Sequence, residues 1–196
     1  MAQLNTEKEV YFSVPSGNYG NLTAGLLAKA MGLPIAGFIA SSNANEIVHK
    51  YLDSGKFEPK PSVQTISNAM DVGNPSNFGR MTELYGQSWE KIIKSIQGFS
   101  ATDKQTKVAM KKVFDEYGYI LDPHGAVGYL GLQHQLKEGA LGVFLETAHP
   151  AKFLDTVHEV IGEVEIPQRL SDYLDKKKVS IEIRSDFSEF KEFLLD

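Results

Sequence analysis

The segment SGNYGN, residues 16–21, combines two glycines with residues that carry hydroxyl and amide groups. Glycines permit backbone angles and close approaches that a Cβ atom would prevent, so successive N–H groups can point into one small volume. A helix is expected to start at Asn21, and the positive end of its dipole attracts anions. Ser16 and Asn18 can add side-chain donors. The segment is therefore interpreted as a cup for a phosphate or carboxylate group.

Three well-known glycine motifs do not fit this spacing. A Walker loop needs Gly-Lys followed by Ser or Thr, and the sequence contains no such triplet. A dinucleotide-binding fingerprint needs G-x-G-x-x-G, whereas Gly17 and Gly20 supply a single interval of three residues. A nucleophile elbow needs a glycine two residues before the serine, where Ser16 is preceded by Val14. A hydrolase nucleophile is not expected, and an ordinary turn between a strand and a helix stays as the alternative.

Thr147 lies just past the carboxyl end of a predicted strand, as the cup does. It follows the apolar run LGVFLE, just as the cup follows the run VYFSV. In an open parallel sheet the carboxyl ends of the strands share one edge, which is where ligands bind. The Thr147 hydroxyl would then meet a heteroatom at the far end of a flat phosphorylated molecule. A helix-capping role ahead of Pro150 explains this threonine equally well.

The elements that would hold these residues alternate between strands and helices. Short β-branched and aromatic runs predict strands, and helical spacing predicts helices. Thr102 with Gln105 forms a capping box, and Asp122 ahead of Pro123 is a predicted N-cap. The order predicts an α/β fold of three layers, a mostly parallel sheet flanked by helices. Residues 1–165 would form the ligand-bearing domain, and residues 166–196 an extension of peripheral strand and helix packed on it. The strands are predicted over 9–14, 35–41 and 141–147, and the helices over 21–31, 43–55, 76–85, 88–96, 102–118, 123–136 and 149–162.

Composition narrows the class of ligand. The net charge of -5, with lysines and arginines scattered along the chain, gives no footprint for a nucleic-acid partner. There is no cysteine, and the five histidines lack paired metal spacing, so no metal site is expected. His124 and His149 follow turns near the expected ligand edge, although structural hydrogen bonds at helix starts explain them too. Because no apolar run approaches a membrane span and no signal-peptide core is present, a cytoplasmic protein with no membrane partner is expected.

Four blocks of the sequence resemble the second half of threonine synthase, a pyridoxal-phosphate enzyme of fold type II. They are VPSGNYGNLTAGLLAKAMGLP, SNAMDVGNPSNFGR, LDPHGAVGY and LETAHPAKF, in this order and at similar spacing. The resemblance implies the later part of the large, cofactor-bearing domain. It also implies conversion of a small phosphorylated amino acid, O-phospho-L-homoserine, with water to L-threonine and phosphate. A non-catalytic domain that binds a phosphate ligand, or another fold type II lyase such as a dehydratase, remains an alternative.

The resemblance implies roles for individual residues as well. The cofactor phosphate would lie on the backbone N–H groups of Ser16, Gly17, Asn18, Tyr19, Gly20 and Asn21. The hydroxyl of Thr147 would meet the pyridine nitrogen, where it tunes the ring as an electron sink. In the long loop that follows residue 57, Arg80 is a candidate partner for a phosphate group. The loop residues that would face substrate, unless they serve surface or capping roles, are Asn68, Asp71, Asn77 and Arg80.

This chemistry would also need a lysine that carries the cofactor as a Schiff base. In the family that lysine lies upstream of the phosphate loop, and no lysine of this sequence matches its block. Lys29 lies on the helix behind the cup, and Lys152 belongs to a different motif. The chain is therefore expected to be a C-terminal fragment, inactive by itself, whose partner is the missing N-terminal half of the same enzyme.

Overall fold

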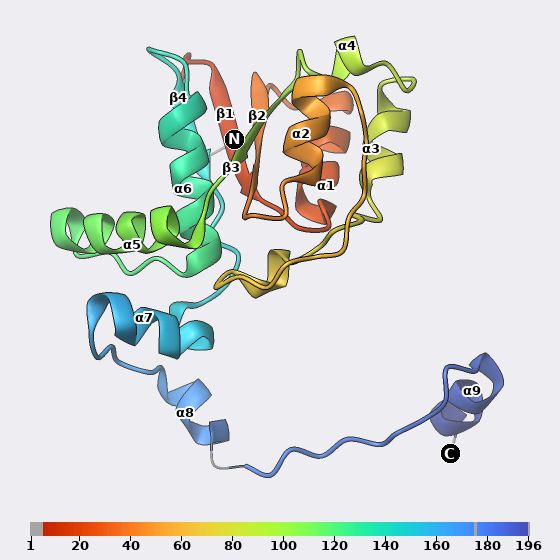
Figure 1. Cartoon of the computed structure of the whole chain (residues 1–196), viewed down its shortest axis with the longest axis vertical. Helices are drawn as coiled ribbons and strands as arrows, with labels where there is room; N and C mark the ends of the chain where they lie inside the picture. The colour runs from red at the N-terminus through yellow and green to blue at the C-terminus, as the bar shows by residue number, and fades with distance from the viewer. Residues whose placement is uncertain (1–5, 175, 196) are drawn as a thin grey trace. The chain divides into compact units, whose positions relative to one another are not determined.

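A parallel sheet of four strands forms the centre of residues 6–164 (Figure 1). The computed structural model describes residues 6–174 and 176–195, and the chain divides into two compact units after Val164. Phe12 lies opposite Phe38 on one neighbouring strand and Val143 on the other. The strand order is β3-β2-β1-β4, with bounds β1 (Val10–Pro15), β2 (Gly37–Ser42), β3 (Ile96–Ser100) and β4 (Leu141–Phe144). The expected parallel α/β sheet is confirmed.

Helices cover both faces of this sheet (Figure 1). On one face α1 (Gly20–Ala30) and α2 (Ile47–Ser54) enclose a core that includes Leu22 and Phe38. On the other face α6 (Pro123–Gln135) contacts all four strands, and α5 (Asp103–Tyr117) packs on α6. The shorter elements of this unit are η1 (Asn68–Met70), α3 (Phe78–Leu84), α4 (Trp89–Ile92), η2 (Pro150–Phe153) and α7 (Leu154–Ile161).

The starts of α5 and α6 are fixed by the predicted capping residues. Thr102 Oγ1 accepts a hydrogen bond from the Gln105 N–H at 3.3 Å, and Gln105 Oε1 accepts one from the Thr102 N–H at 2.9 Å. Asp122 accepts from the N–H of His124 at 2.8 Å, with Pro123 at the first helical position. Each cap satisfies helix N–H groups that have no partner inside the helix. The second cap also determines where the His124 side chain lies.

Strand β3 corrects the predicted secondary structure, which continued a helix to Ile96 and contained three strands. The segment IQGFS is short, lacks polar alternation and carries a glycine, so it has little strand signal of its own. Tertiary contacts decide its conformation. It pairs with β2, and a Cβ at Gly98 would lie 2.5 Å from Nδ1 of His49 on α2. The glycine thus allows α2 to pack closely on this edge strand.

The second unit begins at Glu165 and contains α8 (Gln168–Leu174) and α9 (Phe187–Leu195). The described residues of this unit show no strand, although a peripheral strand was expected there. Its packing on the first unit stays a prediction. None of the helices in the described ranges is long and apolar enough to cross a membrane.

Candidate functional site

The loop that joins β1 to α1 presents a row of free backbone donors at the carboxyl edge of the sheet. The Ser16 N–H donates to the Ser41 carbonyl at 2.8 Å, which fixes the loop to β2. In the described part of the chain, none of the next six N–H groups, from Gly17 to Leu22, donates to another residue. The first turn of α1 contains no acidic residue. A row of unused N–H groups at a helix N-terminus is suited to an anion.

Gly17 and Tyr19 shape this loop in ways that the sequence suggested only in part. A Cβ at Gly17 would lie 2.5 Å from Cα of Met70, so only glycine allows the two backbones to come this close. The left-handed backbone angle of this loop occurs at Tyr19, with φ of 59°. Its side chain is 3% exposed and packs in the core beneath α1. Burial of the ring therefore holds a backbone angle that is costly for a residue with a side chain.

The loop opens on a cavity of about 230 Å³, the cup cavity. Thr147 lines the same cavity, so the structure brings together the cup and this hydroxyl, as the sequence predicted. No lysine, arginine, aspartate or glutamate is among the residues that line it. An anion held here would thus be held by backbone N–H groups and a helix dipole. The lining residues are Pro15, Ser16, Gly17, Asn18, Tyr19, Gly20, Asn21, Ala69, Met70, His124 and Thr147.

The side chains of Ser16 and Asn18 add less to the cup than expected. The Ser16 hydroxyl donates to the Val14 carbonyl at 3.0 Å. Oδ1 of Asn18 accepts from the N–H of Ser76 at 2.5 Å and from its hydroxyl at 3.0 Å. The Asn18 side chain thus ties the cup to the start of α3. The donors that face the cavity are mainly those of the backbone.

The four predicted substrate residues occupy three different environments. Asn77 and Arg80 lie beside the cup, because Asn77 Nδ2 donates to the Asn18 carbonyl at 2.8 Å and Arg80 donates to Asn77 Oδ1 at 3.1 Å. Asn68 lines a neighbouring cavity of about 370 Å³ that also contains Lys152. Asp71 lies in a network of hydrogen bonds. Its carboxylate accepts from the N–H and hydroxyl of Thr65 and from the amides of Asn43 and Asn45, at 2.7 to 3.1 Å.

A cluster of two carboxyl groups and a histidine adjoins the cup cavity. His124 lines this cavity, and Glu146 is the half-buried member of the cluster. Asp122 and His124 are 0% and 3% exposed, and Nδ1 of His124 lies 2.7 Å from Oδ1 of Asp122. Burial and the neighbouring Asp122 carboxyl raise the pKa of Glu146 to about 8. A Cβ at Gly125 would lie 2.1 Å from Glu146 Oε1, so this glycine makes room for the carboxyl. Sequence reasoning identified Asp122 as a cap and left His124 open, but it missed Glu146.

Lys29 and Lys152 are not among the residues that line the cup cavity. Among the described residues, no lysine lines it. The Lys29 ammonium donates to the carbonyls of Ile35 and, at 2.8 Å, Ala36, and its burial lowers its pKa. Lys29 therefore holds the segment before β2, and Lys152 lines the neighbouring cavity.

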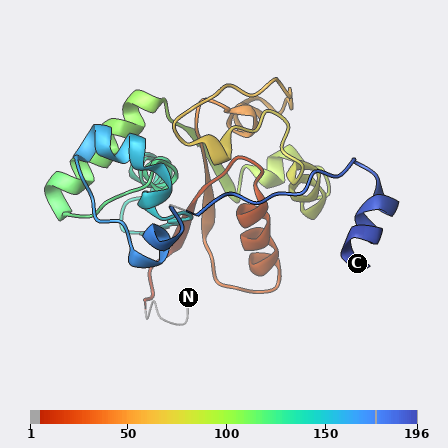
Figure 2. The same ribbon diagram turned by 90° about the horizontal axis from the view of Figure 1, so that it is seen from below.

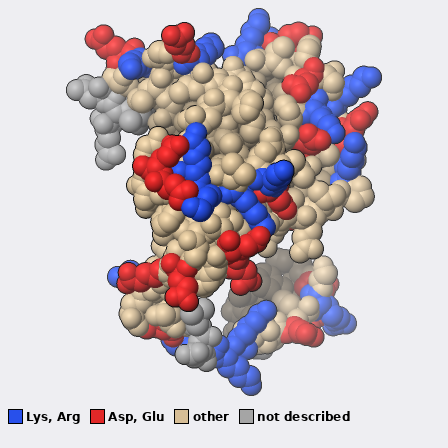
Figure 3. Space-filling model, turned by 60° about the vertical axis from the view of Figure 1, so that its left-hand side comes forward, with Lys and Arg blue, Asp and Glu red and all other residues tan. Residues whose placement is uncertain are grey.

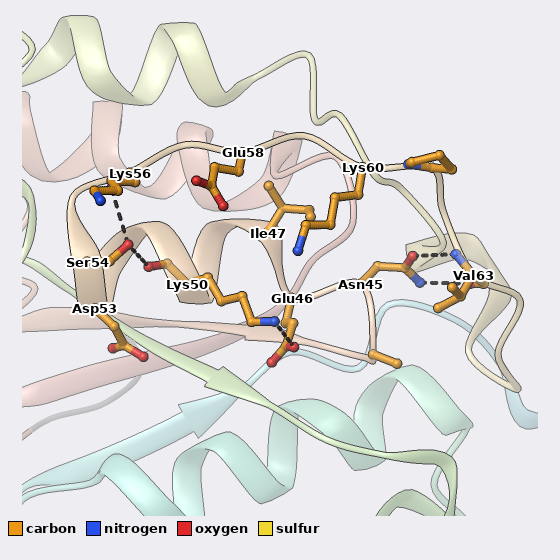
Figure 4. A pocket seen from close by; sticks show the side chains of 12 residues that line it. Asn45, Glu46, Ile47, Lys50, Asp53, Ser54, Lys56, Glu58, Lys60 and Val63 are labelled. Carbon is orange, nitrogen blue, oxygen red and sulfur yellow. Dashed lines mark hydrogen bonds and ion pairs between the residues drawn. The ribbon is translucent and has the colours of Figure 1, made fainter.

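A separate cavity of about 360 Å³ lies between α2 and residues 56–63 (Figure 4). We call it the α2 cavity. Three acidic and three basic side chains line it, and Lys50 pairs with Glu46 at 2.6 Å. The same mixture of signs occurs on the face shown in Figure 3, where blue and red side chains are interspersed. The charged residues of the α2 cavity are Glu46, Lys50, Asp53, Lys56, Glu58 and Lys60.

A protein-family match and a match to a curated protein both point to threonine synthase. Residues 125–194 match the family described as "Threonine synthase, C-terminal". The threonine synthase of Buchnera aphidicola subsp. Schizaphis graminum is 44% identical over 191 residues, which are 96% of this chain and 44% of that protein.

Two solved structures extend this result to the fold. The crystal structure of Escherichia coli threonine synthase shares 40% identity with a TM-score of 0.84, covering 98% of this chain and 45% of that one. A pyridoxal-phosphate-bound threonine synthase from Brucella melitensis shares 31% identity with a TM-score of 0.85, covering 98% and 47%. These matches confirm the fold that the sequence predicted. The chain therefore matches the C-terminal portion of threonine synthase over nearly its whole length, and it spans a little under half the length of these relatives.

Proposed function

We propose that this chain forms the cofactor-phosphate side of a threonine synthase, a pyridoxal-phosphate-dependent lyase. The reaction of the whole enzyme would convert O-phospho-L-homoserine and water to L-threonine and phosphate. One observation carries the proposal. The free N–H groups of the cup and the hydroxyl of Thr147 face one cavity, as a flat ring with a phosphate at one end requires.

The residues present fit a phosphorylated ring. Six N–H groups without an acceptor in the described structure, Gly17 to Leu22, supply hydrogen bonds for a dianionic phosphate. The approach of Met70 to Gly17 limits the volume behind it. At the other end, Thr147 offers a hydroxyl that can donate to a ring nitrogen or accept from it. Because a hydroxyl does not force this nitrogen to stay protonated, Thr147 would set how strongly the ring attracts electrons.

The residues of this chain would bind and orient, whereas the bound cofactor supplies an electron sink for proton removal from the substrate. The cup fixes the phosphate, and Asn18 fixes the cup to α3 through Ser76. Arg80 lies one hydrogen bond away, on Asn77, and we propose it as a partner for the substrate phosphate. We propose Asn68 as a contact from the neighbouring cavity. Asp71 would act indirectly, because its carboxylate is already occupied by hydrogen bonds.

The lysine needed for covalent attachment of the cofactor would come from the part of the family fold that this chain does not cover. The relatives are more than twice as long as the matched region. Among the described residues, no lysine lines the cup cavity. We propose that activity requires that second part as its partner. We also keep the cytoplasm as the proposed location, and the packing of residues 166–196 on the first unit as a proposal.

A reduction experiment tests this division of roles. The 196-residue chain is mixed with pyridoxal phosphate and reduced with borohydride, and its labelled peptides are mapped. We expect scattered, weak labelling of surface lysines and no phosphate release from O-phospho-L-homoserine. One dominant labelled lysine together with turnover would contradict the proposal.

A phosphate-binding domain without catalysis is the alternative, and one experiment distinguishes it from the enzyme. If the chain is joined or mixed with the complementary part of a relative, the enzyme proposal expects threonine formation. Phosphate binding that persists without any such activity would favour the binding domain instead. A dehydratase would be recognised by release of ammonia from serine or threonine under the same conditions.

A further inference from the structure

The segment Asn68–Asp71, which we call the clasp, closes one side of the cup cavity. Ala69 and Met70 line this cavity. Met70 packs directly on the cup, since a Cβ at Gly17 would lie 2.5 Å from its Cα and 2.8 Å from its carbonyl carbon. Figure 2 shows the short η1 helix beside the loop that follows β1. A shift of the clasp would therefore change the space available to an anion on the cup.

Two attachments to distant parts of the sequence hold the clasp. At its end, the Asp71 carboxylate accepts hydrogen bonds from Asn43 and Asn45, which directly follow β2. At its middle, the Ala69 N–H donates to Nε2 of His124 at 3.2 Å. The first attachment connects the clasp to the sheet, and the second connects it to the N-terminus of α6.

The hydrogen bonds of His124 specify its tautomer. Because Nε2 accepts from the Ala69 N–H, the proton of a neutral ring must be on Nδ1. Nδ1 lies 2.7 Å from Oδ1 of Asp122, which is the acceptor this proton needs. Asp122 also accepts the backbone N–H of His124 at 2.8 Å. Both side chains are buried, and the imidazole packs against the Phe153 ring at a centroid distance of 4.7 Å, so the ring orientation is fixed.

The charge of Asp122 is maintained by its surroundings. Burial alone would raise the pKa of Asp122, but hydrogen bonds from His124 and Glu146 outweigh burial and hold it below its usual range. The adjacent Glu146 has the opposite shift, with its pKa raised to about 8. At neutral pH, therefore, Glu146 holds a proton while Asp122 is the ionised acceptor for the imidazole.

We propose that Asp122 and His124 are positioning residues, which hold the clasp against the cup through the Nδ1-protonated tautomer of His124. In this arrangement the affinity of the cup for a phosphate depends on His124, which lines the cavity, and on Asp122, which does not line it and acts through His124. The proposal rests on the proposed function for the identity of the anion. The hydrogen bond to Ala69 and the tautomer are independent of it.

Binding of inorganic phosphate to three variants of the full chain tests this role. His124→Phe keeps a ring against Phe153 but removes the acceptor, and His124→Gln keeps a side-chain acceptor. Thr106→Val is the matched control, because it removes one hydrogen bond from a buried side chain of α5, to Thr102. We expect His124→Phe to bind phosphate about tenfold more weakly than wild type, the loss of one hydrogen bond, and His124→Gln to recover most of it. Thr106→Val should bind as wild type does.

Nitrogen-15 NMR supplies the readout that a merely structural role would not change. We expect the wild-type imidazole to be protonated on Nδ1, and the Ala69 amide to exchange slowly. This exchange should accelerate in His124→Phe but not in Thr106→Val. Protonation on Nε2 in the wild type, or unchanged phosphate affinity and unchanged Ala69 exchange in a folded His124→Phe, would overturn the proposal.

The remaining outcomes can be distinguished. If His124→Phe does not fold, the wild-type tautomer and the His124→Gln variant decide the question. If the wild-type chain binds no phosphate, the proposed function is contradicted. The tautomer and the Ala69 exchange then decide whether the clasp is held as described.

Discussion

The cup cavity and the α2 cavity differ in how they could bind a ligand. The cup cavity has no charged lining residue and offers backbone N–H groups whose positions are fixed by β1, α1 and the clasp. The α2 cavity has six charged side chains, of which Lys50 and Glu46 already pair with each other. Its long side chains would have to be immobilised by a ligand, whereas backbone donors are ordered when the chain folds.

The comparison indicates that a candidate site is identified by donors that folding already holds in place, more than by the number of charged side chains. The larger and more charged cavity contains opposite charges in equal number, and exposed pairs of this kind contribute little. The smaller cavity has a close backbone approach at Gly17, a left-handed angle at Tyr19 and buried polar side chains behind it. Such features cost free energy and are concentrated at functional sites.

Gly17→Ala should have the largest effect. Its Cβ would lie 2.5 Å from the Met70 backbone, so the cup and the clasp must move apart. We expect about 1–3 kcal/mol of destabilisation and phosphate binding that is weaker by roughly 10- to 100-fold. Thermal unfolding and a phosphate titration measure the two effects.

Gly20→Ala is the matched control for this substitution. At Gly20 the nearest atom to a new Cβ is Nδ2 of Asn77 at 3.8 Å, which is an ordinary contact. Its φ is not positive, so alanine fits there without strain. Equal losses of phosphate affinity in the two variants would show that the close approach at Gly17 is not what shapes the cup.

Glu146→Gln tests the cluster of Asp122, His124 and Glu146 beside the cup through the pH dependence of stability. The folded-state pKa of about 8 lies above the ordinary value of 4.5. The stability that this group contributes is thus fully present below about pH 4.5 and is lost as pH rises through 8. Between pH 4.5 and 8 we expect the free energy of unfolding of the wild type to fall by on the order of 1 kcal/mol, after allowance for solvent screening. The fall should be smaller in Glu146→Gln, which cannot ionise at this position.

Chemical denaturation at several pH values between 5 and 9 measures this difference. Glu163→Gln is a suitable control, because Glu163 is exposed and lies outside the cluster. A wild-type pH profile that coincides with that of Glu146→Gln would show that Glu146 is ionised throughout, which contradicts the raised pKa.

The smallest effect is expected in the α2 cavity. Lys60→Ala and Glu58→Ala change charged residues that line this cavity and not the cup cavity. We expect the phosphate affinity to stay within about twofold of wild type, because separated surface charges are screened by salt. A loss as large as that of Gly17→Ala would mean that phosphate binds among the charged side chains, and the comparison between the cavities would have to be reversed.

Sequence reasoning identified much of the fold because local signals were strong. The capping residues Thr102 and Asp122 start their helices as predicted, and the order of strands and helices gave the parallel sheet. It failed at β3, whose five residues have little strand character without β2 and α2 beside them. It also did not predict the left-handed angle at Tyr19, which the burial of that ring holds in place.

The sequence by itself determined the cup, because a glycine-containing turn between a strand and a helix start leaves N–H groups without partners wherever it folds. It also placed Thr147 at the same edge of the sheet through strand order. Only the tertiary structure decided that Asp71 is occupied by Thr65 and Asn43, and that His124 reaches Ala69. The contact of Asp71 with Asn43 joins residues 28 positions apart and that of His124 with Ala69 joins residues 55 positions apart, and local spacing carries no information about such pairs.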